Sequence, residues 1–357
     1  MVIYRFNEQN FSDILSNYRT PIMGIAMICI MLYHQTWVLN GFFMEWIHLL
    51  GYIGVEIFLF LSGFGLVHSL SKNNLNQFYR HRIKRILPAC FVFGILKISL
   101  SFIPTMPKVS NFFLDLLGLS HWYIYAIVIY YLVSPILYKI IKKYGWYPLI
   151  AISIISFFIV YIWKADTNAP YFIKYARWIL KRFPVFILGM TIALRPINWR
   201  LSTYLILGIL FLGLNIISLH FIIGVNANGL ESTNIINRFF YLVPNRTDIP
   251  DNGRYLLDML SVFGLCLTFS FVAYISSKFH FLSILNWFGI YSLELYLCHQ
   301  YVFKVFLEHS IGNPYIELLI SCITSVVVAY IIKVISQMCC RSFYSIIQNN
   351  KIKSYGR

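Results

Sequence analysis

Residues 50–70 read LGYIGVEIFLFLSGFGLVHSL, an apolar run of 21 residues in which Glu56 is the one carboxylate. A helix that crosses a bilayer needs about 20 predominantly apolar residues, so this run predicts a transmembrane helix. The composition agrees, because 59% of the 357 residues are hydrophobic and only 12% are charged. Soluble domains carry roughly 25% charged residues. An ordinary soluble enzyme, a disordered chain and a disulfide-stapled secreted domain are therefore excluded, and we predict a multispanning membrane protein.

The apolar stretches number ten, which predicts an all-α polytopic protein with both termini on one side of the membrane. The N-terminal segment, the loops after the even-numbered spans and the C-terminal tail hold seventeen Lys or Arg, against seven in the opposite loops. Since basic residues accumulate in cytoplasmic loops, both termini are predicted to be cytoplasmic. We interpret residues 1–357 as one integral-membrane domain with a cytoplasmic tail at 337–357. The predicted spans are 21–39, 50–70, 86–103, 119–138, 146–163, 178–194, 202–222, 255–276, 282–307 and 314–336.

The net charge of +16 follows the same topology rule. In a soluble protein it would suggest nucleic-acid binding, but here most basic residues lie at the ends of apolar runs. We therefore predict membrane lipids, and no nucleic acid, as partners. The seven cysteines form no C-x-x-C pair and five of them lie inside apolar runs, so we interpret them as small core residues.

Two ionisable residues lie inside the first two spans, where charge is expensive and marks a functional site. His34 lies about five residues from the outer end of its span and Glu56 about six residues past the outer start of the next, which puts both about 7–9 Å below the outer surface. A carboxylate beside an imidazole fixes its tautomer and raises its basicity, as a general base requires. The spacing equally allows a buried histidine that a neighbouring carbonyl or hydroxyl group satisfies.

Further polar side chains fall in the same predicted outer half of the membrane. His121 and Trp122 open the fourth span, and the ninth span carries Tyr296 and His299. The depth of His299 is close to that of His34. Three histidines are enough for a metal site, but no two of them are spaced i and i+4 on one helix, so we expect no metal.

The segment QFYRHRIKRILP (residues 77–88) is the strongest cytoplasmic signal. Arg82 and Arg85 are expected on one helical face, with Arg80 and Lys84 beside them, which gives a dense patch of hydrogen-bond donors. Guanidinium forks suit phosphate groups. A positive-inside anchor on anionic lipid headgroups is the alternative.

The run GYIGVEIFLFLSGF (residues 51–64) resembles the second-span signature of the membrane acyltransferase-3 family, in which glycine, valine, an acidic residue and aromatic residues precede Leu-Ser-Gly. The resemblance covers about residues 18–336. Further segments that follow the family's order are Tyr33-His34, FYRHRIKRILP (78–88), HWY (121–123), FPVFILG (183–189) and SLELYLCH (292–299).

This resemblance implies an integral-membrane O-acyltransferase, which transfers an acyl group, usually acetyl, from cytoplasmic acyl-CoA to a hydroxyl group of an extracytoplasmic glycan or lipid-linked oligosaccharide. The family's essential histidine maps onto His34, with Glu56 as its orienting acid, and the chemistry is either direct transfer or transfer through an acyl-histidine. The basic motif maps onto Arg80, Arg82 and Arg85 and implies that they bind the phosphates of coenzyme A. As oxyanion donors or acceptor-binding residues we expect the set His121, Trp122, Tyr296 and His299.

One position departs from the family's pattern. The family places a basic residue eleven positions before the histidine, where this chain has Met23. The nearest alternative is Arg19, which we expect just outside the first helix, because Thr20 suits a helix cap and Pro21 the first helical position. Arg19 is then a candidate contact of the donor's phosphate end.

Two other function classes fit a polytopic protein with buried charges. One is a transporter or flippase for glycans, which should show two similar halves with broken helices, a symmetry the sequence lacks. The other is a non-catalytic partner of a polysaccharide-assembly machine. We expect a multi-pass protein of a bacterial inner membrane in either case.

Overall fold

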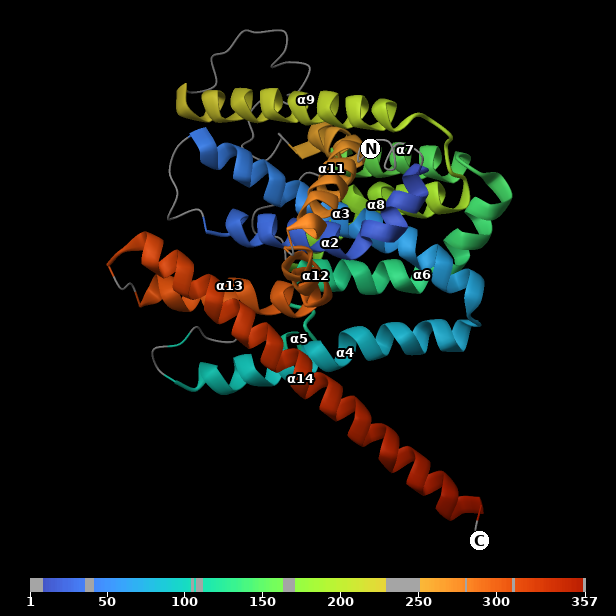
Figure 1. Cartoon of the computed structure of the whole chain (residues 1–357), viewed down its shortest axis with the longest axis vertical. Helices are drawn as coiled ribbons and strands as arrows, with labels where there is room; N and C mark the ends of the chain where they lie inside the picture. The colour runs from blue at the N-terminus through green and yellow to red at the C-terminus, as the bar shows by residue number, and fades with distance from the viewer. Residues whose placement is uncertain are drawn as a thin grey trace. The chain divides into compact units, whose positions relative to one another are not determined.

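A computed structural model describes residues 9–35, 42–103, 106, 112–162, 171–228, 251–279, 281–309 and 312–355, and all regular structure within these ranges is helical (Figure 1). Residues 223–254, which the sequence predicts to be the longest outer loop, lie largely outside these ranges. The helices are α2 (Phe11–Tyr33), α3 (Phe42–Lys72), α4 (Leu75–Ser101), α5 (Phe112–Leu116), α6 (Trp122–Tyr144), α7 (Tyr147–Ile162), α8 (Tyr171–Leu194), α9 (Leu201–Asn228), α11 (Asp251–Lys278), α12 (Leu282–Ile290), α13 (Ser292–Glu308) and α14 (Pro314–Tyr355).

Each of the ten predicted spans overlaps a helix, so the all-helical class is confirmed. Within the described ranges, five helical segments are long and apolar enough to cross a membrane, and two shorter apolar helices accompany them at Tyr147–Ile159 and Leu201–Ile217. The number of crossings and the side of the termini stay predictions. The five long segments are Phe11–Tyr33, Leu50–Lys72, Trp122–Tyr144, Leu257–Lys278 and Tyr315–Arg341.

Several helix ends differ from the predicted boundaries. The first helix begins at Phe11 rather than at Pro21, because Asn10 adopts an extended backbone (φ −71°, ψ 154°) at the N-cap and Asp13 favours the first turn. Pro21 therefore lies inside α2, and Arg19 is a helical residue. The ninth stretch is divided into α12 and α13 at Tyr291, and α14 continues through the predicted tail to Tyr355.

The helices group into two compact units. Unit 1 comprises Met1–Lys72 and Leu132–Gly289, and unit 2 comprises Asn73–Tyr131 and Ile290–Arg357. In unit 1, α3 is the most buried span and packs against both α2 and α8. In unit 2, α4 packs against α5, α13 and α14, and the neighbouring pair α13 and α14 can be followed in Figure 1.

Glycines fix the register of α3 in unit 1. Gly63 lies against the Phe186 carbonyl group and Gly189 lies against the Phe60 carbonyl group, so α3 and α8 run parallel in backbone contact. Such small-residue contacts drive helix association in membranes, where apolar side chains gain nothing from leaving lipid. On the other side of α3, Gly51 lies against Tyr33 of α2. The depth of every polar side chain on α3 is thereby set.

We predict that Gly189→Ala destabilises unit 1, because the added methyl group would overlap the Phe60 carbonyl oxygen. Overpacking of this kind costs about 1–3 kcal/mol. Gly213→Ala on α9 is the control, since no atom lies within 4 Å of the position of its Cβ. Thermal unfolding of the two variants in detergent measures the difference. An equal melting temperature would show that α3 and α8 can move apart without loss of stability.

Candidate active site

His34 ends the first helix of unit 1. Its backbone N–H donates to the carbonyls of Ile30 (3.3 Å) and Met31 (3.2 Å), which closes the last turn of α2. The imidazole packs edge-on against Tyr33, with ring centroids 4.8 Å apart. A histidine in this position lies at the edge of the helical core, where its ring is held by an aromatic neighbour.

The partner of Glu56 is Arg182, which corrects the expected contact with His34. Arg182 Nε lies 2.7 Å from Glu56 Oε1, and the two residues are only 5% and 1% exposed. Among the residues that the structure describes, none donates a hydrogen bond to Glu56 Oε2. The physical reason is the glycine register between α2 and α3, which puts Glu56 about 10 Å deeper than His34 at a rise of 1.5 Å per residue.

A second cation accompanies Arg182. Lys181 Nζ donates to Tyr52 Oη (3.0 Å), and the Arg182 guanidinium lies 5.0 Å from the centre of the Tyr52 ring. Lys181 and Asp258 are also buried, and both charges act on Glu56. Two cations and two carboxylates make this cluster neutral in sum, as a group of charges in an apolar core must be. We call these five residues, Glu56 included, the α3–α8 charge cluster.

Arg19 lies inside α2, fifteen residues before His34. Its Nε donates to the Leu61 carbonyl (3.3 Å), and its guanidinium packs on Gly65, where the missing side chain leaves room for it. The helix is continuous between the two residues, so Arg19 and His34 differ by about 60° around it. The expected position outside the helix is therefore wrong, because Asn10 rather than Thr20 caps α2.

The basic residues of α4 divide between different surroundings in unit 2. Arg85 makes a two-pronged ion pair with Glu294, at 2.6 Å and 3.4 Å, and donates to the Ile290 carbonyl (3.1 Å). Lys333 of α14 reaches the same carboxylate at 3.1 Å. Glu294 is 1% exposed, so one buried carboxylate joins α4, α13 and α14. Arg82 instead lies over the rings of Phe78 and Tyr131, at 5.5 Å and 5.7 Å.

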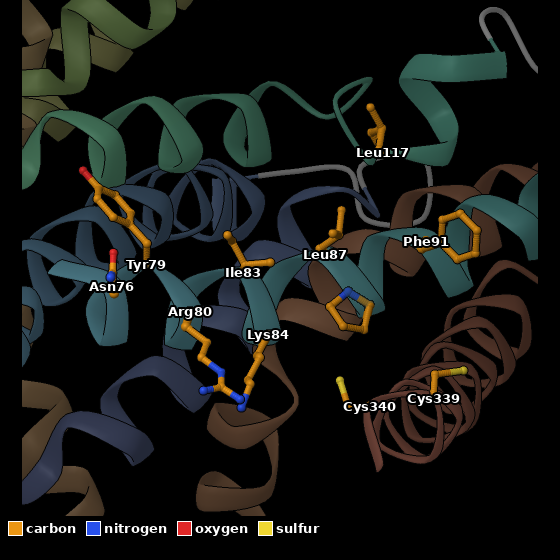
Figure 2. A pocket seen from close by; sticks show the side chains of 11 residues that line it. Asn76, Tyr79, Arg80, Ile83, Lys84, Leu87, Phe91, Leu117, Cys339 and Cys340 are labelled. Carbon is orange, nitrogen blue, oxygen red and sulfur yellow. The ribbon is translucent and has the colours of Figure 1, made fainter. Parts of the chain in front are cut away.

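Arg80 and Lys84 line a pocket of about 950 Å³. They are one helical turn apart, and Figure 2 shows their side chains leaving α4 together with their nitrogen-bearing ends close to each other. The remaining walls are mostly apolar, from α4, Leu117 and the last helix. The other lining residues are Asn76, Tyr79, Ile83, Leu87, Pro88, Phe91, Leu117, Cys339 and Cys340. The pocket therefore combines a cationic end with an apolar wall.

The structure brings three of the four expected substrate-binding residues together in unit 2. The Tyr296 ring lies 6.4 Å from that of His121 and 5.7 Å from that of His299. His299 Nδ1 is 2.8 Å from the Leu295 carbonyl oxygen, which orients its ring. Trp122 follows His121 and stacks edge-on with Tyr123 at 6.1 Å. Within the described ranges, no three His, Cys, Asp or Glu side chains are grouped as metal ligands would be, and the expectation of no metal stays a prediction.

A family model described as an acyltransferase domain matches residues 24–334. The chain belongs to the acyltransferase-3 family. The match covers both units, and it confirms the membership that the motifs predicted. No curated protein and no solved structure matches the chain.

Sequence reasoning missed the partners that neutralise the buried acids of this acyltransferase. Lys181 and Arg182 lie inside the sixth predicted span and Lys333 lies inside the tenth. A count of basic residues in the loops does not include them. Lys97, Asp115 and Asp258 also lie buried or half-buried and were not singled out. The signal that could have found them is the rule that an ionisable residue within a span has a partner in another span.

We predict that Glu294→Gln strongly destabilises the acyltransferase, because it leaves Arg85 and Lys333 facing each other without a carboxylate between them. Breaking a buried ion pair costs about 3–5 kcal/mol. The control is Glu308→Gln on the same helix, whose partner Lys304 lies 3.8 Å away at the exposed surface, where an ion pair contributes about 0–1 kcal/mol. Chemical denaturation in detergent compares them, and similar unfolding midpoints would contradict a stabilising role for Glu294.

Proposed function

We propose that the protein is an integral-membrane O-acyltransferase of a bacterial inner membrane, which transfers an acetyl group from acetyl-CoA to a hydroxyl group of an exported or cell-surface polysaccharide. Membership of the acyltransferase-3 family supports acyl transfer by a membrane protein. The observation that supports the donor is the pocket on α4, and the observation that supports the acceptor is the aromatic and histidine cluster around Tyr296.

The donor pocket suits the two ends of acyl-CoA. Its phosphates need cationic donors, which Arg80 and Lys84 provide at one end of the pocket. The flexible pantetheine arm can lie along the apolar wall formed by Ile83, Leu87 and Phe91. We include Arg82, Arg85 and Arg19 in the donor proposal, as the family resemblance implies. Glu294 already binds Arg85, so Arg85 contributes a fixed positive charge rather than a guanidinium group that can turn toward a phosphate.

His34 is the proposed general base. It takes the proton of the acceptor hydroxyl as that oxygen attacks the thioester carbonyl. The carbon–sulfur bond then breaks, and the His34 imidazolium returns the proton to the departing coenzyme A thiolate. Tyr296, His121 and His299 are the proposed donors to the developing oxyanion or to the acceptor, with Trp122 beside them. Glu56, paired with Arg182, acts within the α3–α8 charge cluster by holding the local field in which the base works.

We expect His34→Ala to reduce acylation of cell-surface polysaccharide at least about 100-fold, because general-base catalysis contributes about 10²–10⁴-fold. The matched control is His309→Ala, since His309 also ends a helix and makes the same kind of backbone contact, but is exposed. Mass spectrometry of the polysaccharide gives the readout, with protein levels measured in parallel.

Equal acylation in the two histidine variants would contradict the proposal. If the wild-type protein also failed to turn over acetyl-CoA, the results would favour a flippase or a non-catalytic assembly partner over an enzyme.

We expect Arg80→Gln to weaken acetyl-CoA binding roughly 10- to 100-fold, because hydrogen bonds to charged groups contribute about 1.5–3 kcal/mol. Lys142→Gln is the control, because it removes one exposed positive charge at the end of α6. It tests the effect on binding of losing a positive charge that does not line the pocket. Equilibrium binding of labelled acetyl-CoA to purified variants measures the change. Unchanged affinity for Arg80→Gln would leave the basic segment as a lipid anchor.

A further inference from the structure

Three side chains that pack around one turn of α4 in unit 2 each carry a buried polar atom. These atoms are Asp115 Oδ2, His121 Nε2 and Tyr301 Oη, and none of them has a hydrogen-bond partner among the residues that the structure describes. The proposed acyl transfer assigns His121 to the developing oxyanion or to the acceptor. Asp115 and Tyr301 have no assigned role.

All three side chains contact the turn from Phe93 to Lys97. The Phe93 ring lies 5.9 Å from that of His121 and 6.3 Å from that of Tyr301. One turn further along the same face, Lys97 pairs with Asp115 through Oδ1, which leaves Oδ2 on the other side of the carboxylate. The charges of Lys97 and Asp115 both act on His121, which places the imidazole near this ion pair.

Two glycines hold the chain segment that carries Asp115 and His121 close to α4. Gly94 of α4 leaves room for the carbonyl of Asp115, because a Cβ there would lie 2.6 Å from that oxygen. Gly118 adopts φ +70° and packs on Cys90, with only 2.7 Å between its Cβ position and the sulfur. Backbone in the left-handed region favours glycine. The segment that carries Asp115 and His121 therefore lies at a fixed position against the Phe93–Lys97 turn.

Buried polar atoms are almost always hydrogen-bonded, because their desolvation is otherwise uncompensated. Three unsatisfied atoms around one turn thus point to a group that binds there. A carboxylate oxygen accepts, a phenol donates, and an imidazole nitrogen does either. Neighbouring hydroxyl groups match all three at once, since each hydroxyl both donates and accepts. The rings of Phe93 and Tyr296 supply the apolar surface that binding sites place beside a few convergent polar groups.

We infer that Asp115, His121 and Tyr301 form a hydroxyl-binding site for a sugar of the acceptor polysaccharide, with Lys97 as the residue that positions Asp115. The half-buried His121 and Trp122 give the site its accessible edge. This inference rests on the proposed acyl transfer for the identity of the ligand. It adds Asp115 and Tyr301 as binding residues, which neither the motifs nor the family match supplied.

Tyr301→Phe is the sharpest test, because it removes one oxygen atom and keeps the ring on Phe93. With polysaccharide extracted from cells that lack the protein as acceptor, we expect KM to rise roughly tenfold, a change equivalent to one hydrogen bond. The affinity for acetyl-CoA and the melting temperature should not fall, since the hydroxyl has no protein partner to lose. Tyr315→Phe on the exposed surface of α14 is the control.

Lys97 tests the positioning role separately. Lys97→Met should raise the KM for the polysaccharide. Lys97→Arg should return the KM most of the way to the wild-type value, because arginine renews the ion pair with Asp115. A merely structural role would lower the melting temperature of Lys97→Met and leave the KM of the surviving protein unchanged.

An unchanged KM for Tyr301→Phe overturns the inference. So does a fall of several degrees in its melting temperature, because the hydroxyl group would then be bonded within the folded protein, through water. Equilibrium dialysis of the polysaccharide without acetyl-CoA separates this inference from the proposed function. If wild type binds the polysaccharide and Tyr301→Phe does not, the site stands even where no acyl transfer is found; if neither binds, the site is rejected.

Discussion

Among the residues that the structure describes, three carboxylates buried between helices pair with cations, and these ion pairs constrain how the helices pack. Glu56 pairs with Arg182 in unit 1, and in unit 2 Glu294 pairs with Arg85 and Lys333 while Asp115 pairs with Lys97. A charge in an apolar interior is tolerated only when it is paired and hydrogen-bonded, so helices that carry these residues must pack where the partners meet. The ion pairs therefore select among the many ways in which apolar helices could associate.

The same requirement changes how the basic segment of α4 functions. Arg85 is held by Glu294, whereas Arg80 and Lys84 line the pocket with its apolar wall. A family motif that looks uniform in sequence is thus divided into a structural part and a part suited to bind phosphate.

Glycine contacts set the depth at which each polar group lies. Gly63 and Gly189 bring α3 and α8 into backbone contact, and Gly51 does the same for α3 and α2. With the register fixed, Glu56 lies level with Arg182 and deeper than His34. Glu56 and the proposed base His34 consequently lie at different levels along α2 and α3.

Hydropathy alone determined that the chain is a helical membrane protein, because apolar runs of this length and number are stable only inside a lipid bilayer. The motif around Glu56 determined the family, since that order of small, acidic and aromatic residues is specific. Partners such as Arg182 for Glu56 and Glu294 for Arg85 were decided only by the tertiary structure. Each of these two ion pairs joins residues more than a hundred positions apart, and the helix register that brings them together depends on where glycines allow backbones to touch. No local pattern in the sequence spans that distance, which is why these contacts could not be predicted from the sequence.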